Sequence, residues 1–169
     1  MPAERWALEV GGLDAAGLQQ ALEHAGIALN PLAEELLSSA VFACTLPSQH
    51  LSLESCTVQA LGFPDGATLP AILDAAQAQA LHPCPMDAAA YLRLHHLQQV
   101  EDSDTKPRST PGAPAGSLTV ATVHPGQPDT FPRGFYLRNI DGTLWLRGYR
   151  ADDLHVWHPE DTLVFRRLP

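Results

Sequence analysis

Arginine and aromatic residues alternate along two stretches of the chain that are joined by Asp141-Gly142. Asp-Gly between two β-rich runs predicts a hairpin, because a type I′ turn needs positive φ at both central residues. The resulting register places five side chains on one face, Tyr136, Arg138, Trp145, Arg147 and Tyr149. Opposed guanidinium groups and rings can stack, so this face could bind an acidic peptide, a nucleotide or single-stranded nucleic acid.

The opposite face of the same hairpin is apolar and is the expected core side, with Phe135, Leu137, Leu144 and Leu146. The arginine and aromatic face therefore has a second interpretation. A helix could partly cover it, with the arginine stems packed on the rings of a two-sided sheet.

Histidine and aspartate residues near the C-terminus form the other candidate group, Asp152, Asp153, His155 and His158. Imidazole and carboxylate together suit zinc or another divalent ion, and imidazole is a common general base near neutral pH. No HExxH-like order accompanies them. We therefore expect a surface turn here, with Trp157 folded back onto the sheet, and neither a metal site nor a cofactor.

Nucleophilic catalysis has little support in the sequence. The chain lacks GxSxG, P-loop and GxGxxG motifs. Cys44, Cys56 and Cys84 are widely spaced, without a CxxC pair, and their sequence neighbourhoods are not basic. We expect them to be small, buried, reduced residues. Whether the protein is an enzyme stays open, with the balance against it.

Charge is divided unevenly along the chain. Its 10 Lys+Arg against 19 Asp+Glu give a net charge of -9, which disfavours a general nucleic-acid or anionic-membrane binder. Residues 1–90 hold ten of the acids and a single base, Arg5, whereas residues 91–169 hold nine of each. The first half thus offers an acidic surface, and another protein is the expected partner.

Local signals predict several elements in the first half. Alternation indicates a strand at 5–10, Asp14 and Gly26 bound a helix over 15–25, and Asn30 begins another over 31–39. A strand over 51–58 precedes a turn at 63–66. A third helix follows, capped by Thr68 and stopped by the Pro83-Cys84-Pro85 run. Residues 91–97 fit a short helix or a strand, and the strand is favoured.

The whole pattern predicts an α+β fold. A mostly antiparallel β-meander from the C-terminal half, with strands at 118–123, 135–140, 143–150 and 163–168, packs against two or three short helices from the N-terminal half. We divide the chain into 1–45 and 46–169, within one co-linear unit. The strands at 5–10 and 51–58 join the main sheet or a small N-terminal subdomain. Residues 101–117, rich in proline and polar residues, are expected to be a flexible insertion.

The order of several turn and core motifs resembles an uncharacterised family of small bacterial proteins. The motifs are the run from Leu61 to Thr68, Cys84-Pro85, Leu92-Arg93-Leu94, the run from Asp141 to Leu146, and Trp157-His158-Pro159. The resemblance spans about residues 13–168. It implies a bacterial origin and one co-linear unit, and it supplies no catalytic residue.

The N-terminus lacks the basic-then-apolar order of a secretion signal, and no apolar run reaches the roughly 18–20 residues that span a bilayer. We therefore expect a cytoplasmic protein without membrane contact. The favoured function is a non-enzymatic interaction or accessory protein that binds another macromolecule. The alternatives are nucleotide or single-stranded nucleic-acid binding by the arginine and aromatic face, and an enzyme with a histidine-centred site.

Overall fold

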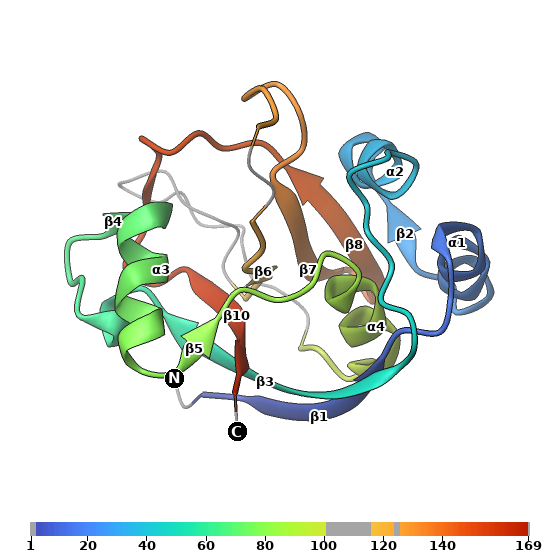
Figure 1. The fold of residues 1–169 in the computed structure, drawn as a ribbon, viewed down its shortest axis with the longest axis horizontal. Helices are drawn as coiled ribbons and strands as arrows, with labels where there is room; N and C mark the ends of the chain where they lie inside the picture. The colour runs from blue at the N-terminus through green and yellow to red at the C-terminus, as the bar shows by residue number, and fades with distance from the viewer. Residues whose placement is uncertain (1–2, 101–115, 124–125, 169) are drawn as a thin grey trace.

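The chain adopts an α+β fold in which helices pack around a large, curled, mixed sheet (Figure 1). The structure is a computed structural model, and it describes residues 3–100, 116–123 and 126–168. The helices are α1 (Ala15–His24), α2 (Pro31–Leu37), α3 (Leu69–Ala78) and α4 (Ala88–His95), with a 3-10 turn, η1 (Gln59–Leu61). The strands are β1 (Arg5–Val10), β2 (Ala28–Leu29), β3 (Gln49–Thr57), β4 (Ala67–Thr68), β5 (Leu81–His82), β6 (Leu118–Val120), β7 (Gly134–Ile140), β8 (Thr143–Tyr149), β9 (Val156–Trp157) and β10 (Thr162–Arg167).

The main sheet runs in the order β1-β3-β10-β6-β7-β8-β2, with β5 also paired to β10. Most pairs are antiparallel, as predicted, while β10 with β6 and β2 with β8 are parallel. Strands β6, β7 and β8 follow one another in the sheet as the predicted meander. The final strand, β10, does not continue it next to β8 but lies between β3 and β6, and it contributes apolar residues to both faces of the sheet.

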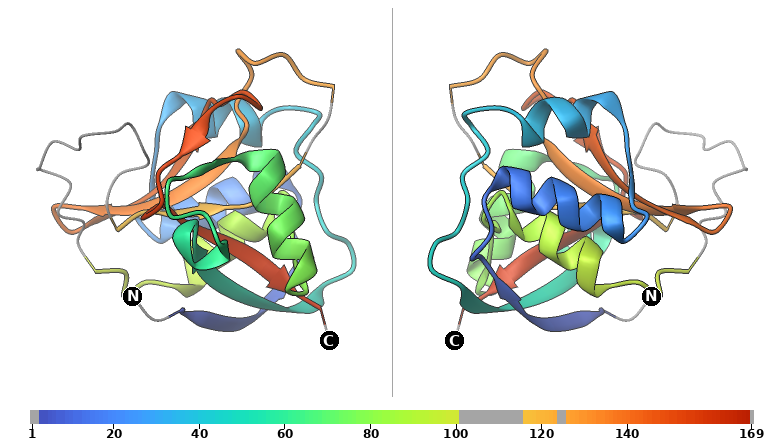
Figure 2. Two further views of the ribbon diagram at one scale, coloured as in Figure 1. Left: turned by 90° about the vertical axis from the view of Figure 1, so that its left-hand side faces the viewer. Right: turned by 90° about the vertical axis from the view of Figure 1, so that its right-hand side faces the viewer.

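Two hydrophobic cores lie on the two faces of this sheet. Helices α1, α2 and α4 pack on one face, and α3 with the small β4–β9 ladder packs on the other (Figure 2). Strand β10 contributes to both, since Val164 lies in the first core and Leu163 and Phe165 lie in the second. The strands predicted at 5–10 and 51–58 join the main sheet as β1 and β3.

Two of the predicted helix caps are present, and one is not. The Asp14 side chain accepts a hydrogen bond from Gly17 N at 2.8 Å, and Asn30 accepts one from Ala33 N at 2.9 Å. Gly26 has the left-handed φ of 73° expected after α1. Thr68 precedes α3 in extended conformation, yet its side chain forms no capping hydrogen bond.

Residues 91–97 are not a strand, and the preference for one was wrong. The segment lies mostly in α4, whose first residues are three alanines, all fully buried. A strand would have faced the hairpin as another sheet layer, whereas a helix places Leu92 in the core and Arg93 beneath the hairpin. Asp87, which precedes α4, makes no capping hydrogen bond through its side chain. Its carboxylate turns instead to Thr45, whose N–H and hydroxyl donate to it at 2.7 and 2.8 Å.

The N-cap residue of helix α2 also hydrogen-bonds to the backbone of β8. Asn30 Oδ1 accepts a hydrogen bond from Gly148 N at 2.8 Å in addition to the capping bond, and Asn30 Nδ2 donates to Gly148 O at 3.0 Å. The approach is close enough that a Cβ on Gly148 would lie 2.6 Å from the carbonyl carbon of Leu32. Glycine at 148 is therefore required by the distance between helix and sheet.

The predicted insertion at 101–117 lies mostly outside the described residues, because only Gly116 and Ser117 of it are described. Within the described part of the chain, no helix is long and apolar enough to cross a membrane.

Glu54 on β3 joins three strands through two arginines. Arg167 of β10 donates to its carboxylate through Nε at 2.7 Å and Nη2 at 3.2 Å, and Arg5 Nε of β1 lies 3.3 Å away. The hydrogen bonds from Arg167 lower the pKa of this carboxyl group, against the opposing effect of burial. The carboxylate should therefore stabilise the sheet in its ionised form.

Replacing Glu54 with glutamine should make the protein less stable at neutral pH, with a deficit that shrinks as the pH falls. A carboxyl group whose pKa is lowered on folding contributes stability above its unfolded pKa, and this contribution is lost as the pH falls through its folded pKa. Thermal unfolding of both proteins between pH 7 and pH 2.5 measures the difference. The exposed Glu35→Gln variant is the control. A deficit that did not change with pH would contradict the assignment.

Candidate functional site

The hairpin β7–β8 has the register predicted from sequence. Arg138 lies opposite Trp145, and Tyr136 lies opposite Arg147. The turn residues Asp141 and Gly142 have φ of 52° and 82°, as a type I′ turn requires. All five predicted side chains consequently share one face, which we call the hairpin face: Tyr136, Arg138, Trp145, Arg147 and Tyr149.

Arg147 is held at the centre of the hairpin face by two aromatic residues. Its Cζ lies 4.9 Å from the ring centroid of Trp145 and 5.9 Å from that of Tyr136. Its Nε donates a hydrogen bond to Tyr136 Oη at 2.9 Å. In the described part of the chain, no acceptor or carboxylate pairs with the Nη atoms of Arg147. The guanidinium is thus fixed in orientation, with both terminal nitrogens available.

The other end of the hairpin face merges into the second core. Tyr149 lies edge-on to Tyr136, with ring centroids 6.2 Å apart, and edge-on to Trp157 at 5.6 Å. Burial raises the pKa of the Tyr149 phenol well above its ordinary value. Tyr149 therefore belongs to a covered part of the sheet, with Trp157 of β9 packed on it, while the half-buried Trp145 and Arg147 lie beyond this cover.

Arg93 supports the hairpin from the opposite side, a role that was not predicted from the sequence. The side chain is fully buried, and its Nη1 donates to Gln99 Oε1 at 2.7 Å and to the carbonyl oxygens of Arg138 and Trp145, each at 3.3 Å. Its Nη2 donates to His96 O. Desolvation lowers the pKa of Arg93 to about 10, so the guanidinium is still charged at neutral pH.

Gln99 extends this support to the neighbouring strands. Its side-chain Nε2 donates to Leu137 O at 3.0 Å and to Gly116 O at 3.2 Å. The main-chain carbonyl oxygen of Gln99 accepts a hydrogen bond from Asn139 Nδ2 at 2.7 Å. Together with Arg93, this network fixes the backbone that carries the hairpin face. The only sequence signal for it is an arginine among apolar residues, in the Leu92-Arg93-Leu94 run.

The four histidine and aspartate candidates are each engaged in a separate local contact. His155 lies edge-on to Trp157, and His158 Nδ1 accepts from Glu160 N at 3.1 Å. Asp152 Oδ1 accepts from Leu154 N at 2.9 Å, and Asp153 pairs with Arg133. Nowhere in the ranges that the structure describes do three or more His, Cys, Asp or Glu residues form a group that could hold a metal ion. The structure therefore does not bring these candidates together as one site.

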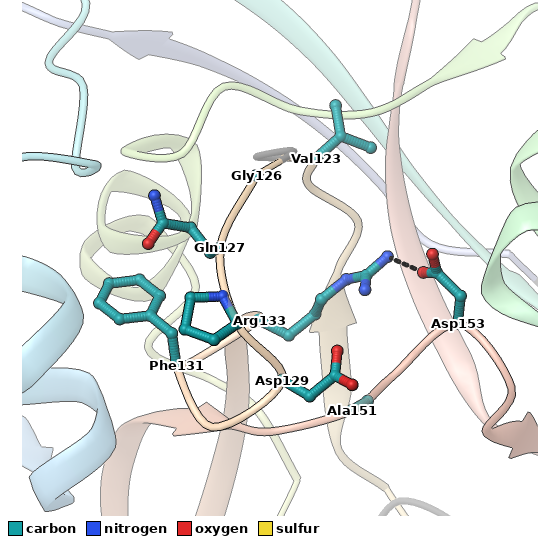
Figure 3. A pocket seen from close by; sticks show the side chains of 9 residues that line it. Val123, Gly126, Gln127, Asp129, Phe131, Arg133, Ala151 and Asp153 are labelled. Carbon is teal, nitrogen blue, oxygen red and sulfur yellow. Dashed lines mark ion pairs between the residues drawn. The ribbon is translucent and has the colours of Figure 1, made fainter.

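A cavity of about 390 Å³ lies beside Asp153 (Figure 3). Arg133 and Asp153 face one another at its rim, with Nη2 and Oδ1 2.8 Å apart, and Phe131 and Pro128 supply apolar lining. The ion pair already joins the cationic group to a carboxylate. This cavity accordingly offers less for recognising an anion than the hairpin face does.

The cysteines are poor nucleophiles in this fold. Cys84 is buried, with its Sγ 3.7 Å from Val164 O, and burial raises the pKa of its thiol to about 12. Burial also raises the thiol pKa of Cys44 and Cys56, although both are only partly buried, which corrects the expectation that all three are core residues. A thiol with a raised pKa is protonated at neutral pH and reacts slowly.

Comparison of the chain with protein-family models, with curated proteins and with solved structures finds no match. The likeness to an uncharacterised bacterial family consequently stays a prediction, and the interpretation of the site depends on the geometry of the chain itself.

Proposed function

We propose that this protein is a non-enzymatic accessory protein of the bacterial cytoplasm, which binds an acidic segment of a partner protein at the hairpin face. The observation that carries the proposal is the position of Arg147. Its guanidinium is stacked between Trp145 and Tyr136, and its Nη atoms have no partner among the residues that the structure describes.

The arrangement suits a carboxylate. A guanidinium can bind a carboxylate through two parallel hydrogen bonds, and this pairing depends on the orientation of the planar group. Because Tyr136 already fixes the orientation of Arg147, binding would require little further ordering of the side chain. The exposed part of the Trp145 ring can supply apolar contact next to the charged pair.

A partner protein is a better candidate than nucleic acid because of charge. The net charge of -9 opposes any anion, but it opposes a polynucleotide, with one charge on every phosphate, more than a short acidic segment with a few carboxylates. Stacking of a base on Trp145 is the second candidate, since the ring lies on the same side of the sheet as Arg147. The histidine-centred enzyme has less support, because its four candidate side chains are each held in a separate contact.

Tryptophan fluorescence can report binding at this face directly. Trp6 and Trp157 are 8% and 3% exposed, so Trp145 is the tryptophan most accessible to a ligand. A glutamate-rich peptide should change the emission of the wild-type protein. Arg147→Gln should weaken the binding about tenfold or more, because it removes a charge-assisted, bidentate contact. Arg150→Gln is the matched control, since Arg150 is exposed and its Nε donates to Thr130 O.

Equal affinity of wild-type and Arg147→Gln proteins for the peptide, or no binding by either, would contradict the proposal. A parallel titration with a thymidine oligonucleotide at two salt concentrations separates the second candidate. Tighter binding of the oligonucleotide than of the peptide, weakened by salt and by Arg147→Gln, would replace the protein partner with nucleic acid.

A further inference from the structure

Strand β1 forms one end of the main sheet, and its outer edge has no partner strand among the residues that the structure describes. Figures 1 and 2 show β1 along the periphery of the molecule, with β3 on its inner side. The β1–β3 ladder is regular over six consecutive residue pairs, from Arg5 opposite Glu54 to Val10 opposite Gln49. This edge is therefore long and free of a bulge.

The pairing with β3 determines which backbone groups of β1 point outward. Ser55 N donates to Glu4 O at 2.9 Å, so residue 4 forms a hydrogen-bonded pair with residue 55. Such pairs alternate along an antiparallel ladder, so residues 6, 8 and 10 also turn their N–H and C=O groups toward β3. The N–H and C=O groups of Arg5, Ala7 and Glu9 consequently point away from the sheet.

Most of the usual protections of an edge strand are missing. Natural sheets block their edges with proline, with bulges, with very short strands, with inward-pointing charges or with charged side chains on the edge, and of these β1 has only the last. The inward side chains of β1 are Trp6, Leu8 and Val10, all apolar and buried. The charged side chains of β1, on Arg5 and Glu9, lie instead on the solvent face, where their side chains are 73% and 66% exposed.

We propose that β1 is a self-association edge, at which a second copy of this chain adds its own β1 in antiparallel orientation, centred on Ala7. The two sheets would then continue through the interface around a two-fold axis.

This register is the one that matches all the outward backbone groups. Centring on Ala7 places Ala7 opposite Ala7 of the second copy and Arg5 opposite Glu9 of the second copy. Each hydrogen-bonded pair exchanges two bonds, so the three pairs 7–7, 5–9 and 9–5 would form six backbone hydrogen bonds. A shift by two residues in either direction loses one of the three pairs. Parallel pairing would place like charges together and would not close around a two-fold axis.

Side-chain charge favours the same register. Within one copy, Arg5 Nε lies 3.3 Å from Glu54 Oε2, and Glu9 Oε1 lies 3.3 Å from His50 Nε2. Joining the two copies would connect these two side-chain pairs into one row across four strands. The row would run from Glu54 through Arg5 to Glu9 and His50 of the second copy. Opposite charges on directly opposed residues stabilise a sheet, and this register places Arg5 directly opposite Glu9 of the second copy.

The inner face of the joined sheet would also match. In the register centred on Ala7, Trp6 lies opposite Leu8 of the second copy, and Leu8 lies opposite its Trp6. Both residues belong to the first hydrophobic core of their own copy, at 8% and 6% exposure. The apolar stripe would thus continue from one copy into the other, while the charged residues stay together on the outer face.

Charge reversal tests the proposal, with the molar mass measured by sedimentation equilibrium over a wide range of protein concentration. The wild-type chain should approach twice its 18.2 kDa at high concentration. Arg5→Glu and Glu9→Arg should each raise the dimer dissociation constant by roughly tenfold or more, because each creates two like-charge contacts. The double variant Arg5→Glu/Glu9→Arg restores opposite charges and should dimerise again. An equimolar mixture of the two single variants should do the same.

Ala7→Pro provides a second, independent variant. Proline is tolerated on an edge strand where the N–H faces solvent, so the monomer should keep its fold and its far-ultraviolet circular dichroism spectrum. The dimer should be lost, because two central hydrogen bonds disappear. The proposal would be overturned by a wild-type protein that is monomeric throughout, or by a dimer that these substitutions leave unchanged. Neither result bears on the hairpin face, which lies toward the opposite end of the strand order.

Discussion

Replacement of Arg93 by alanine should lower the free energy of unfolding by about 3–5 kcal/mol. The substitution empties the space of a large, fully buried side chain, and it removes the donors to Gln99 Oε1 and His96 O. The unsatisfied buried acceptors and the cavity both lower the free energy of unfolding. Urea denaturation, followed by far-ultraviolet circular dichroism, gives the difference between the two proteins.

Arg93→Met separates the two causes. Methionine fills much of the same volume without any donor, and it also avoids burying a charge that has no acidic partner among the described contacts. If the hydrogen bonds to the hairpin dominate, Arg93→Met should lose most of the stability that Arg93→Ala loses. A methionine variant as stable as the wild type would mean that Arg93 acts by filling space.

Replacement of Asn30 by alanine should lower the free energy of unfolding by about 2–4 kcal/mol. Loss of an N-cap alone typically accounts for about 1 kcal/mol. Asn30 also makes two hydrogen bonds to the backbone of Gly148, and their loss would leave a buried N–H and C=O without these partners. The same denaturation experiment measures this effect.

Asp14→Ala is the matched control for Asn30→Ala. Asp14 caps α1 through Gly17 N in the same way, but this bond is exposed, and within the described residues no hydrogen bond ties the Asp14 side chain to the sheet. We expect a loss of about 0.5–2 kcal/mol for Asp14→Ala. Equal losses for the two variants would show that the contact between Asn30 and Gly148 contributes nothing beyond the cap.

The parts of the fold that the sequence predicted well depend on neighbouring residues in the chain. The hairpin register follows from Asp141-Gly142, and the start of α2 follows from Asn30 before Pro31, so in both places a few residues determine the local backbone. The hairpin face was predictable for the same reason, because alternation along a strand determines which side chains share a face.

The parts that were not predicted depend on residues far apart in the chain. Trp157 folds back onto the sheet, as predicted, but its position over Tyr149 depends on the pairing of β9 with β4, which no local pattern determines. The place of β10 is set by its neighbours β3 and β6. The alternation of Leu92 and Leu94, taken alone, predicts a strand in the α4 segment. Burial of the preceding alanines in the first core favours the helix instead.

The position of β10 also determines how this protein must be assembled on a ribosome. Strand β3 ends at Thr57, and the strand that fills the space between β3 and β6 begins at Thr162, 105 residues later in the chain. At the usual rates of synthesis this interval takes roughly 5–20 s. For that time we expect the nascent chain to hold an unpaired strand edge and two incomplete cores. Such exposed surface is open both to chaperone binding and to aggregation until residues 162–167 emerge.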